Sequence, residues 1–192
     1  MSTDLGYLYL QDVENRLRGL KGLADRAISQ VYDEELFSSI DGVSNSVAVL
    51  MKHIAGNMIH NWTYPFAPDE EKPARDREGE FEAGEDIKDA IFDLWDEGWG
   101  VIIEAVTGFT EAELERRVIV RWREYTLIEA LNRQLVHYAQ HVGQIIFLAK
   151  YFRGEEWESL SIPKGQSEAY NERMRRERSP RTSPADPAPA AP

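Results

Sequence analysis

The chain has 192 residues, of which 42% are hydrophobic and 29% charged, and its formal net charge is −12. This composition is typical of one soluble globular domain with a substantial core. The negative charge repels phosphate backbones, so nucleic acid is not an expected partner. No stretch approaches the roughly 18 apolar residues of a membrane span, and no signal peptide is visible. The absence of cysteine excludes disulfides, zinc–thiolate sites and an intrinsic thiol nucleophile, which indicates a cytoplasmic protein.

Apolar residues recur at steps of three and four along four segments, and this period predicts amphipathic helices. The expected helices cover about residues 10–31, 44–62, 85–106 and 126–153. The second and third are joined by a long charged loop, 66–84, which is long enough to let them run parallel as a crossover. The sequence therefore predicts an all-α fold, a four-helix bundle.

Smaller elements follow from local signals. Residues 110–113 have capping-box spacing and residues 118–125 are rich in β-formers, which predicts a short helical turn and then an extended segment or hairpin. A polar helical segment is expected at about 166–178. The Pro/Ala-rich residues 179–192 cannot bury apolar surface and are expected to be a disordered tail, so the domain is taken as 1–178.

Two of the four histidines, His137 and His141, lie four residues apart in the last long helix. Both imidazoles therefore leave the same side of the helix, with a rise of about 6 Å between them. Metal–nitrogen bonds of roughly 2.0–2.1 Å would let them share one ion, with His53 of the second helix as the third ligand. His60 lies roughly 10 Å further along that helix than His53, too far for the same ion. Spacing alone leaves ordinary hydrogen-bonded histidines as an equal alternative.

Two known metal motifs are excluded by the residues beside the histidines. A zincin helix carries glutamate directly after its first histidine, where this chain has Tyr138. A di-iron carboxylate bundle needs glutamate three positions before histidine, and none of the four histidines has one. Three neutral imidazoles would leave an open coordination position, as in catalytic zinc sites, although nickel, copper and iron also accept imidazole.

Six segments in combination carry a resemblance to a known family: 51–58, 62–63, 71–73, 77–81, 135–144 and 157–165. Across about residues 7–170 the chain resembles the DinB/YfiT-like superfamily, most closely an uncharacterised subfamily. The resemblance implies an up-down-down-up four-helix bundle, often a homodimer, with zinc or nickel on a triad that carries over to His53, His137 and His141. Characterised relatives include transferases and isomerases that depend on a low-molecular-weight thiol such as bacillithiol or mycothiol.

The leading hypothesis is a divalent-metal-dependent enzyme, a thiol-dependent S-transferase acting on a small-molecule substrate. The missing cysteines fit a nucleophile supplied from outside. The alternatives are a metal-dependent hydrolase and a non-catalytic, stress-associated bundle whose metal only ties helices together. Asn57, Tyr138 and Gln144 are candidate pocket residues, although ordinary polar roles on a helix are the commoner explanation for each. No residue is assigned a catalytic role.

The tryptophans are expected to be structural. Trp95, Trp99 and Trp122 are interpreted as core or dimer contacts rather than as platforms for a substrate.

Overall fold

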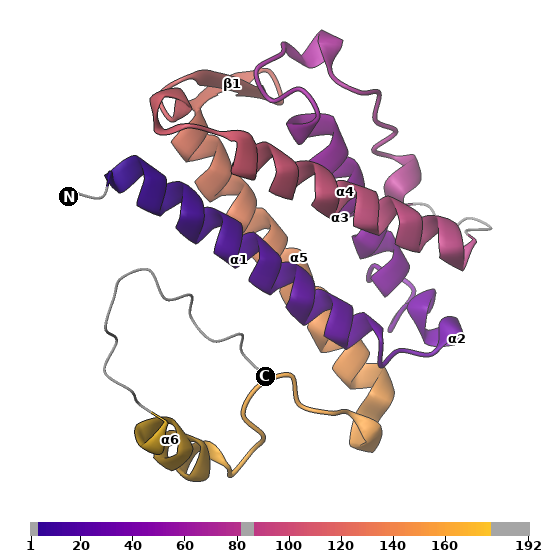
Figure 1. Cartoon of the computed structure of the whole chain (residues 1–192). Coiled ribbons are helices and arrows are strands. Elements are labelled where there is room, and N and C mark those ends of the chain that lie inside the picture. The colour runs from indigo at the N-terminus through magenta and orange to yellow at the C-terminus, as the bar shows by residue number, and fades with distance from the viewer. Residues whose placement is uncertain (1–3, 82–86, 178–192) are drawn as a thin grey trace.

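The computed structural model describes residues 4–81 and 87–177, so the tail expected at 179–192 lies outside the described residues. Four long helices pack together as a bundle (Figure 1). They are α1 (Leu5–Ile28), α3 (Val47–Trp62), α4 (Lys88–Gly108) and α5 (Leu127–Arg153). The predicted all-α four-helix bundle is confirmed. Within the described part of the chain, no helix is both long and apolar enough to cross a membrane.

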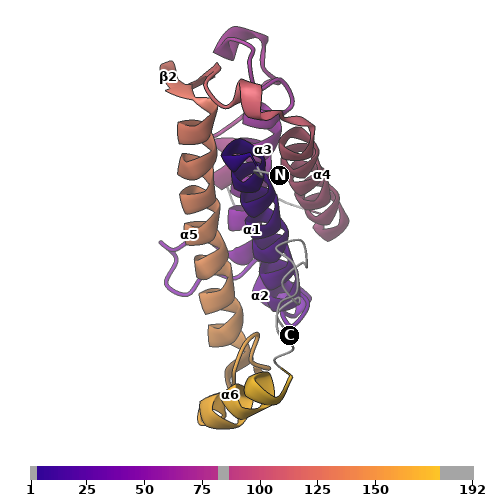
Figure 2. The ribbon, with the colours of Figure 1, turned by 60° about the vertical axis from the view of Figure 1, so that its left-hand side comes forward.

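Helices α1 and α5 lie side by side and run in the same direction (Figures 1 and 2). Near their first turns, the Tyr9 hydroxyl donates to the carbonyl oxygen of Ile128 at 3.2 Å. Beyond their last turns, Nε2 of Gln30 donates to the carbonyl oxygen of Glu158 at 3.1 Å. Contacts at both ends therefore fix the two helices as parallel neighbours.

Helices α3 and α4 form the second parallel pair. Gly98 of α4 packs on Ala55 of α3, and toward the far ends Trp62 lies against Phe109. Both helices run opposite to α1 and α5, which gives an up-down-down-up order (Figure 1). The long segment between α3 and α4 makes the crossover that this order requires.

The helix ends follow from local capping. Thr126 and Glu129 form the predicted capping box at the start of α5, and Gly154, with φ 54°, ends that helix. Helix α1 begins earlier than position 10 because the Asp4 carboxylate accepts a hydrogen bond from the Gly6 N–H at 2.8 Å. Ser46 caps α3 in the same way.

The short elements lie mostly at the ends of the bundle. They are α2 (Asp33–Leu36), the 3₁₀ turns η1 (Asp69–Glu71), η2 (Gly79–Phe81), η3 (Glu111–Glu113) and η4 (Gly154–Glu156), the strands β1 (Arg117–Val120) and β2 (Arg123–Thr126), and α6 (Ser167–Arg176). The antiparallel pair β1–β2 confirms the predicted hairpin, and η3 confirms the predicted helical turn. The charged loop 66–84 contains η1 and η2. Helix α6 has no buried residue and lies below the bundle (Figure 2).

Two of the three singled-out tryptophans belong to the core. Trp95 and Trp99 are buried on α4. The core placement is wrong for Trp122, which is 74% exposed because it occupies the tip of the β1–β2 hairpin. Its part in a dimer stays a prediction.

Glycine 98 lets α3 and α4 approach closely, and this generates a prediction. A Cβ at Gly98 would lie 2.7 Å from the Cα of Ala55, whereas one at Gly100 would meet nothing within 4 Å. We expect Gly98→Ala to lower the free energy of unfolding by about 1–2 kcal/mol, since overpacking outweighs the gain in helix propensity. Gly100→Ala should raise it by about 1 kcal/mol. Urea unfolding measures both, and equal stabilisation by the two changes would contradict the packing.

Candidate metal centre and its pocket

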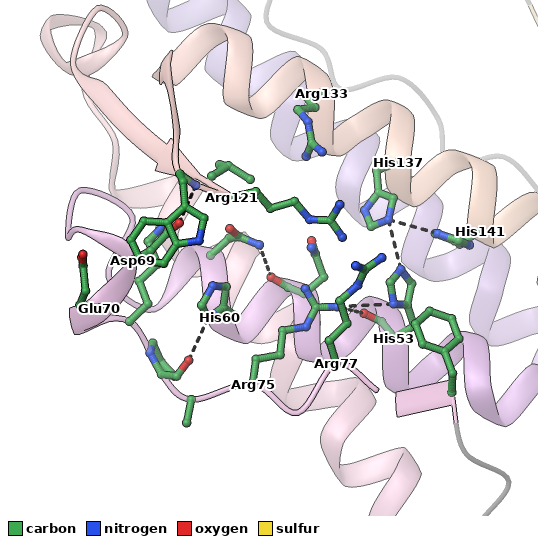
Figure 3. A pocket seen from close by; sticks show the side chains of 18 residues that line it. His53, His60, Asp69, Glu70, Arg75, Arg77, Arg121, Arg133, His137 and His141 are labelled. Carbon is green, nitrogen blue, oxygen red and sulfur yellow. Dashed lines mark hydrogen bonds and ion pairs between the residues drawn. The ribbon is translucent and has the colours of Figure 1, made fainter. Parts of the chain in front are cut away.

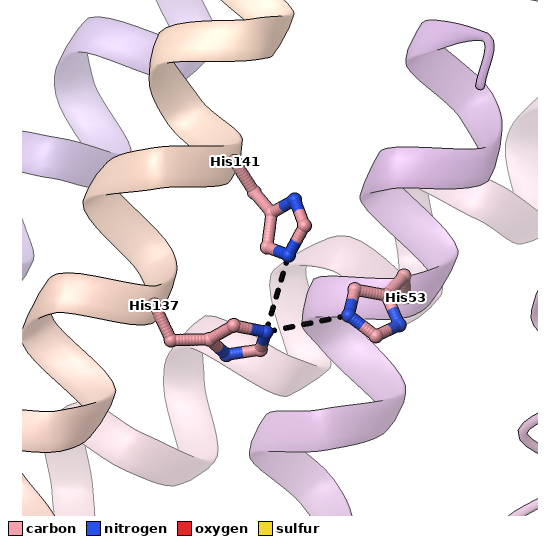
Figure 4. A group of neighbouring side chains, drawn as sticks. All are labelled: His53, His137 and His141. Carbon is pink, nitrogen blue, oxygen red and sulfur yellow. Dashed lines mark hydrogen bonds between the residues drawn. The ribbon is translucent and has the colours of Figure 1, made fainter. Parts of the chain in front are cut away.

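The three predicted ligands converge between two helices. His53 projects from α3, and His137 and His141 project from α5 toward it (Figure 4). Nε2 of His137 lies 3.3 Å from Nε2 of His53 and 3.1 Å from Nε2 of His141. The candidate ligand nitrogens of all three lie within 4.8 Å of one another. The structure therefore brings together three residues that are up to 88 positions apart, as the numbering shows (141 − 53).

This geometry fits a shared divalent ion. Two nitrogens bound at 2.0–2.1 Å with tetrahedral angles lie about 3.3 Å apart. Ligation needs neutral imidazoles, and burial, reinforced by the rings of His141 and His53, lowers the pKa of His137 to about 3. Burial also lowers the pKa of His141, against the opposing effect of its hydrogen bond to Gln144. The histidine cluster could thus hold a metal ion.

A buried carboxylate orients His53. Nδ1 of His53 lies 3.1 Å from Oε2 of Glu80, whose two oxygens also accept bonds of 2.6 and 2.7 Å from Arg75. Burial tends to raise the pKa of Glu80, but the bonds from His53 and Arg75 outweigh it and hold that pKa below its ordinary value. An ionised Glu80 that accepts the Nδ1 proton leaves the Nε2 lone pair of His53 facing the other two rings.

The two histidines of α5 differ in the hydrogen bonds that their Nδ1 atoms make. Nδ1 of His141 lies 2.8 Å from Oε1 of Gln144, an acceptor that again directs the Nε2 lone pair inward. Nδ1 of His137 is buried and has no hydrogen-bond partner among the described residues. Two of the three rings are therefore oriented by side chains of this protein.

Glu80 and Arg75 were not singled out by sequence reasoning, because they reach the site from the crossover loop. One signal in α3 could have indicated that another group approaches this helix. Gly56 lies in the helix interior, where glycine lowers helix stability by about 1 kcal/mol relative to alanine. A Cβ at Gly56 would lie 2.2 Å from Oε1 of Glu80. This glycine leaves the space that Glu80 occupies beside His53.

The three candidate pocket residues occupy different places. Asn57 lines the pocket, and its Oδ1 accepts a 3.0 Å bond from the Tyr138 hydroxyl. Tyr138 is completely buried behind the pocket, accepts a bond of 3.1 Å from Nε1 of Trp62, and has a pKa raised by burial. Gln144 is exposed and contacts the site only through His141.

The triad lies at one end of a pocket of about 760 Å³ (Figure 3). His60, Asp69 and Glu70 lie at the other end. His60 is not part of the histidine cluster, and its Nδ1 donates to the carbonyl oxygen of Pro73 at 2.8 Å. A cavity of this volume is in the range of small-molecule sites, roughly 300–1,000 Å³.

Arginines also line this pocket, in a protein whose net charge is −12. Arg75 is paired with Glu80, but Arg77, Arg121 and Arg133 form no ion pair within the described part of the chain. Loss of solvent and then the charges of Arg77, Arg133 and Arg75 lower the pKa of Arg121. The sequence interpretation missed this cluster, because two of its members lie in a loop and a hairpin whose positions depend on tertiary contacts.

Fold and site together define a four-helix bundle with a three-histidine cluster that could bind a metal. The chain belongs to the family described as protein of unknown function (DUF1572), whose match covers residues 4–166. That span includes all four bundle helices and the whole triad. A search among curated proteins found no match.

The close approach of Gly56 and Glu80 generates a second prediction. We expect Gly56→Ala to weaken metal binding by roughly tenfold or more, because the added methyl displaces the carboxylate that orients His53. Gly22→Ala on α1, where a Cβ would meet nothing within 4 Å, is the matched control and should leave affinity unchanged. Competition with a metallochromic chelator measures the dissociation constant. Unchanged affinity in a folded Gly56→Ala protein would show that Glu80 does not support the site.

Proposed function

We propose that the protein is a divalent-metal-dependent enzyme that uses an exogenous low-molecular-weight thiol as its nucleophile, with zinc or nickel on His53, His137 and His141. The observation that carries the proposal is the position of the three Nε2 atoms at one end of a 760 Å³ pocket. A metal that served only to tie α3 to α5 would need no such space beside it. His137 and His141 are half-buried, so ligands can approach them.

The chain's own residues prepare the site for an external ligand. Glu80 and Gln144 hold His53 and His141 with their Nε2 atoms inward, so little rearrangement accompanies binding. When bound, a divalent ion on three neutral imidazoles supplies Lewis acidity that stabilises a thiol in its thiolate form. Because the chain has no cysteine, such a thiol has to come from solution.

The placement of carboxylates disfavours hydrolysis assisted by a protein general base. Such a reaction would use a base beside the triad. Both oxygens of Glu80 are engaged by Arg75 and His53. Asp69 and Glu70 lie at the opposite end of the pocket (Figure 3). The described residues therefore offer no free carboxylate next to the three imidazoles.

We further propose that this family is a branch of the DinB/YfiT-like superfamily. The up-down-down-up order of α1, α3, α4 and α5 supports this assignment, as does a triad divided between the second and fourth bundle helices. Both features are what the sequence resemblance implies. The proposal concerns descent and fold, and the reaction is argued separately from the site.

Metal content tests the ligand assignment. We expect near-stoichiometric divalent metal in untagged wild-type protein and in His60→Ala, and a large loss in His53→Ala, His137→Ala and His141→Ala. His60→Ala is a matched control, because it removes an imidazole from the same pocket without touching the triad. Elemental analysis measures the content. Equal metal in the control and in the three triad variants would defeat the assignment.

Thiol binding tests the choice of nucleophile. We expect cobalt(II)-substituted protein to develop a sulfur-to-cobalt charge-transfer absorption when N-acetylcysteine is added, and His137→Ala to show none. The chain has no sulfhydryl of its own, so the band can arise only from the added thiol. Absence of the band in cobalt-loaded wild type would overturn the thiol-dependent proposal. Turnover of an electrophilic ester that continues without thiol would favour the hydrolase.

A further inference from the structure

We propose that Arg77, Arg121 and Arg133 form a recognition site for an anionic group, a carboxylate or a phosphate, on the small molecule that reacts at the triad. The proposal deepens the proposed function and rests on it for the role of the bound molecule. The anion-binding site itself depends only on the arginines. All three line the same cavity of about 760 Å³, and none of them forms an ion pair within the described part of the chain.

The three arginines reach the pocket from three separate elements. Arg133 lies one turn before His137 on α5, so both side chains leave the same side of that helix. Arg121 extends from the tip of the β1–β2 hairpin into the pocket, and Arg77 comes from the crossover loop between η1 and η2 (Figure 3). All three side chains are exposed, so solvent screens part of their mutual repulsion, and an anion bound between them would offset the rest.

Local pairing separates these residues from the other cations of the pocket. Lys72 is paired with Asp69, and Arg75 with Glu80. Arg77, Arg121 and Arg133 have no carboxylate partner among the described residues, although 34 acidic residues are present in the chain. Loss of solvent, and after it the charges of Arg77, Arg133 and Arg75, lowers the pKa of Arg121. Among the described residues, no carboxylate neutralises any of the three guanidinium charges, and Arg133 contacts only the Tyr125 ring, 6.0 Å from its centroid.

The backbone conformation at Arg121 also supports a binding site. Arg121 and Trp122 form the two-residue turn between β1 and β2 and have φ values of 54° and 62°. Positive φ at both turn positions favours Asn-Gly, so an Arg-Trp pair is strained there. The turn is held because Asp69 accepts a 2.8 Å bond from the Trp122 N–H, and Lys72 donates to the carbonyl oxygen of Ile119. Strained residues retained by surrounding contacts are typical of binding sites.

The donor chemistry identifies the ligand class. Guanidinium groups are planar, permanently charged and suited to paired hydrogen bonds with carboxylate or phosphate oxygens. The pocket's dimensions suit a small molecule, and the protein's overall charge of −12 disfavours a nucleic acid backbone. A local positive site in a negative protein also concentrates small anions at the entrance to the triad.

The test uses substitutions that remove charge without straining the turn. Arg121→Asn keeps a residue that tolerates positive φ, and Arg133→Gln keeps a residue suited to a helix. Arg123→Gln is the matched control, because Arg123 lies on the same hairpin, is exposed and does not line the pocket. Calorimetry with succinate and with inorganic phosphate as probes is run on metal-loaded and chelator-treated full-length protein, and the metal content of each sample is measured.

We expect Arg121→Asn and Arg133→Gln each to weaken binding of the preferred probe by roughly tenfold or more, with Arg123→Gln unchanged. The preferred probe distinguishes a carboxylate from a phosphate ligand. Arg121→Asn should also raise the melting temperature, because it relieves turn strain while it removes the anion contact.

Two other results overturn different claims. The anion site would be overturned if neither probe bound, or if wild type and both pocket variants bound a probe with equal affinity. In the second case, the bound probe would sit on the ion alone. Arginine-dependent binding in protein that never holds metal would support the anion site and overturn the proposed metal function. Metal content therefore separates the two failures.

Discussion

The buried hydrogen bonds of Tyr138 set the register on which the site depends. Its hydroxyl donates to Asn57 and accepts from Trp62, so this one side chain of α5 is tied to two positions of α3. Tyr138 adjoins His137, and Asn57 lies one turn beyond His53. A slip of either helix by one turn, about 5.4 Å, would break buried bonds and separate the imidazoles at the same time.

Around this pair of helices, the irregular segments complete the site. The crossover loop supplies Glu80 and Arg75 behind His53, and Gly56 makes room for them. The same loop ties down the hairpin tip through Asp69. The helices thus position the candidate ligands, Glu80 of the loop and Gln144 of α5 orient two of them, and loop and hairpin add arginines to the pocket. This division suits a site that binds an ion on one side and an anionic molecule on the other.

Local patterns predicted much of this arrangement. The four helices, the hairpin and the capping box at Thr126 follow from periodicity and from turn and cap preferences, which act over a few residues. Of the two roles expected for Trp122, core or dimer contact, the core role is wrong, because composition does not reveal that a tryptophan occupies a hairpin turn. Glu80 was missed because its link to His53 spans 27 positions and depends on how the loop folds back.

By itself, the sequence determined the helical periods and put His137 and His141 on one side of a helix, since both depend only on helix geometry. It also excluded an internal thiol. The sequence proposed His53 as their partner, but only the tertiary structure decided that it approaches them, that Glu80 and Gln144 orient the rings, and that three arginines share the pocket. These outcomes depend on packing between segments far apart in the chain, where local propensity carries no information and buried contacts select the arrangement.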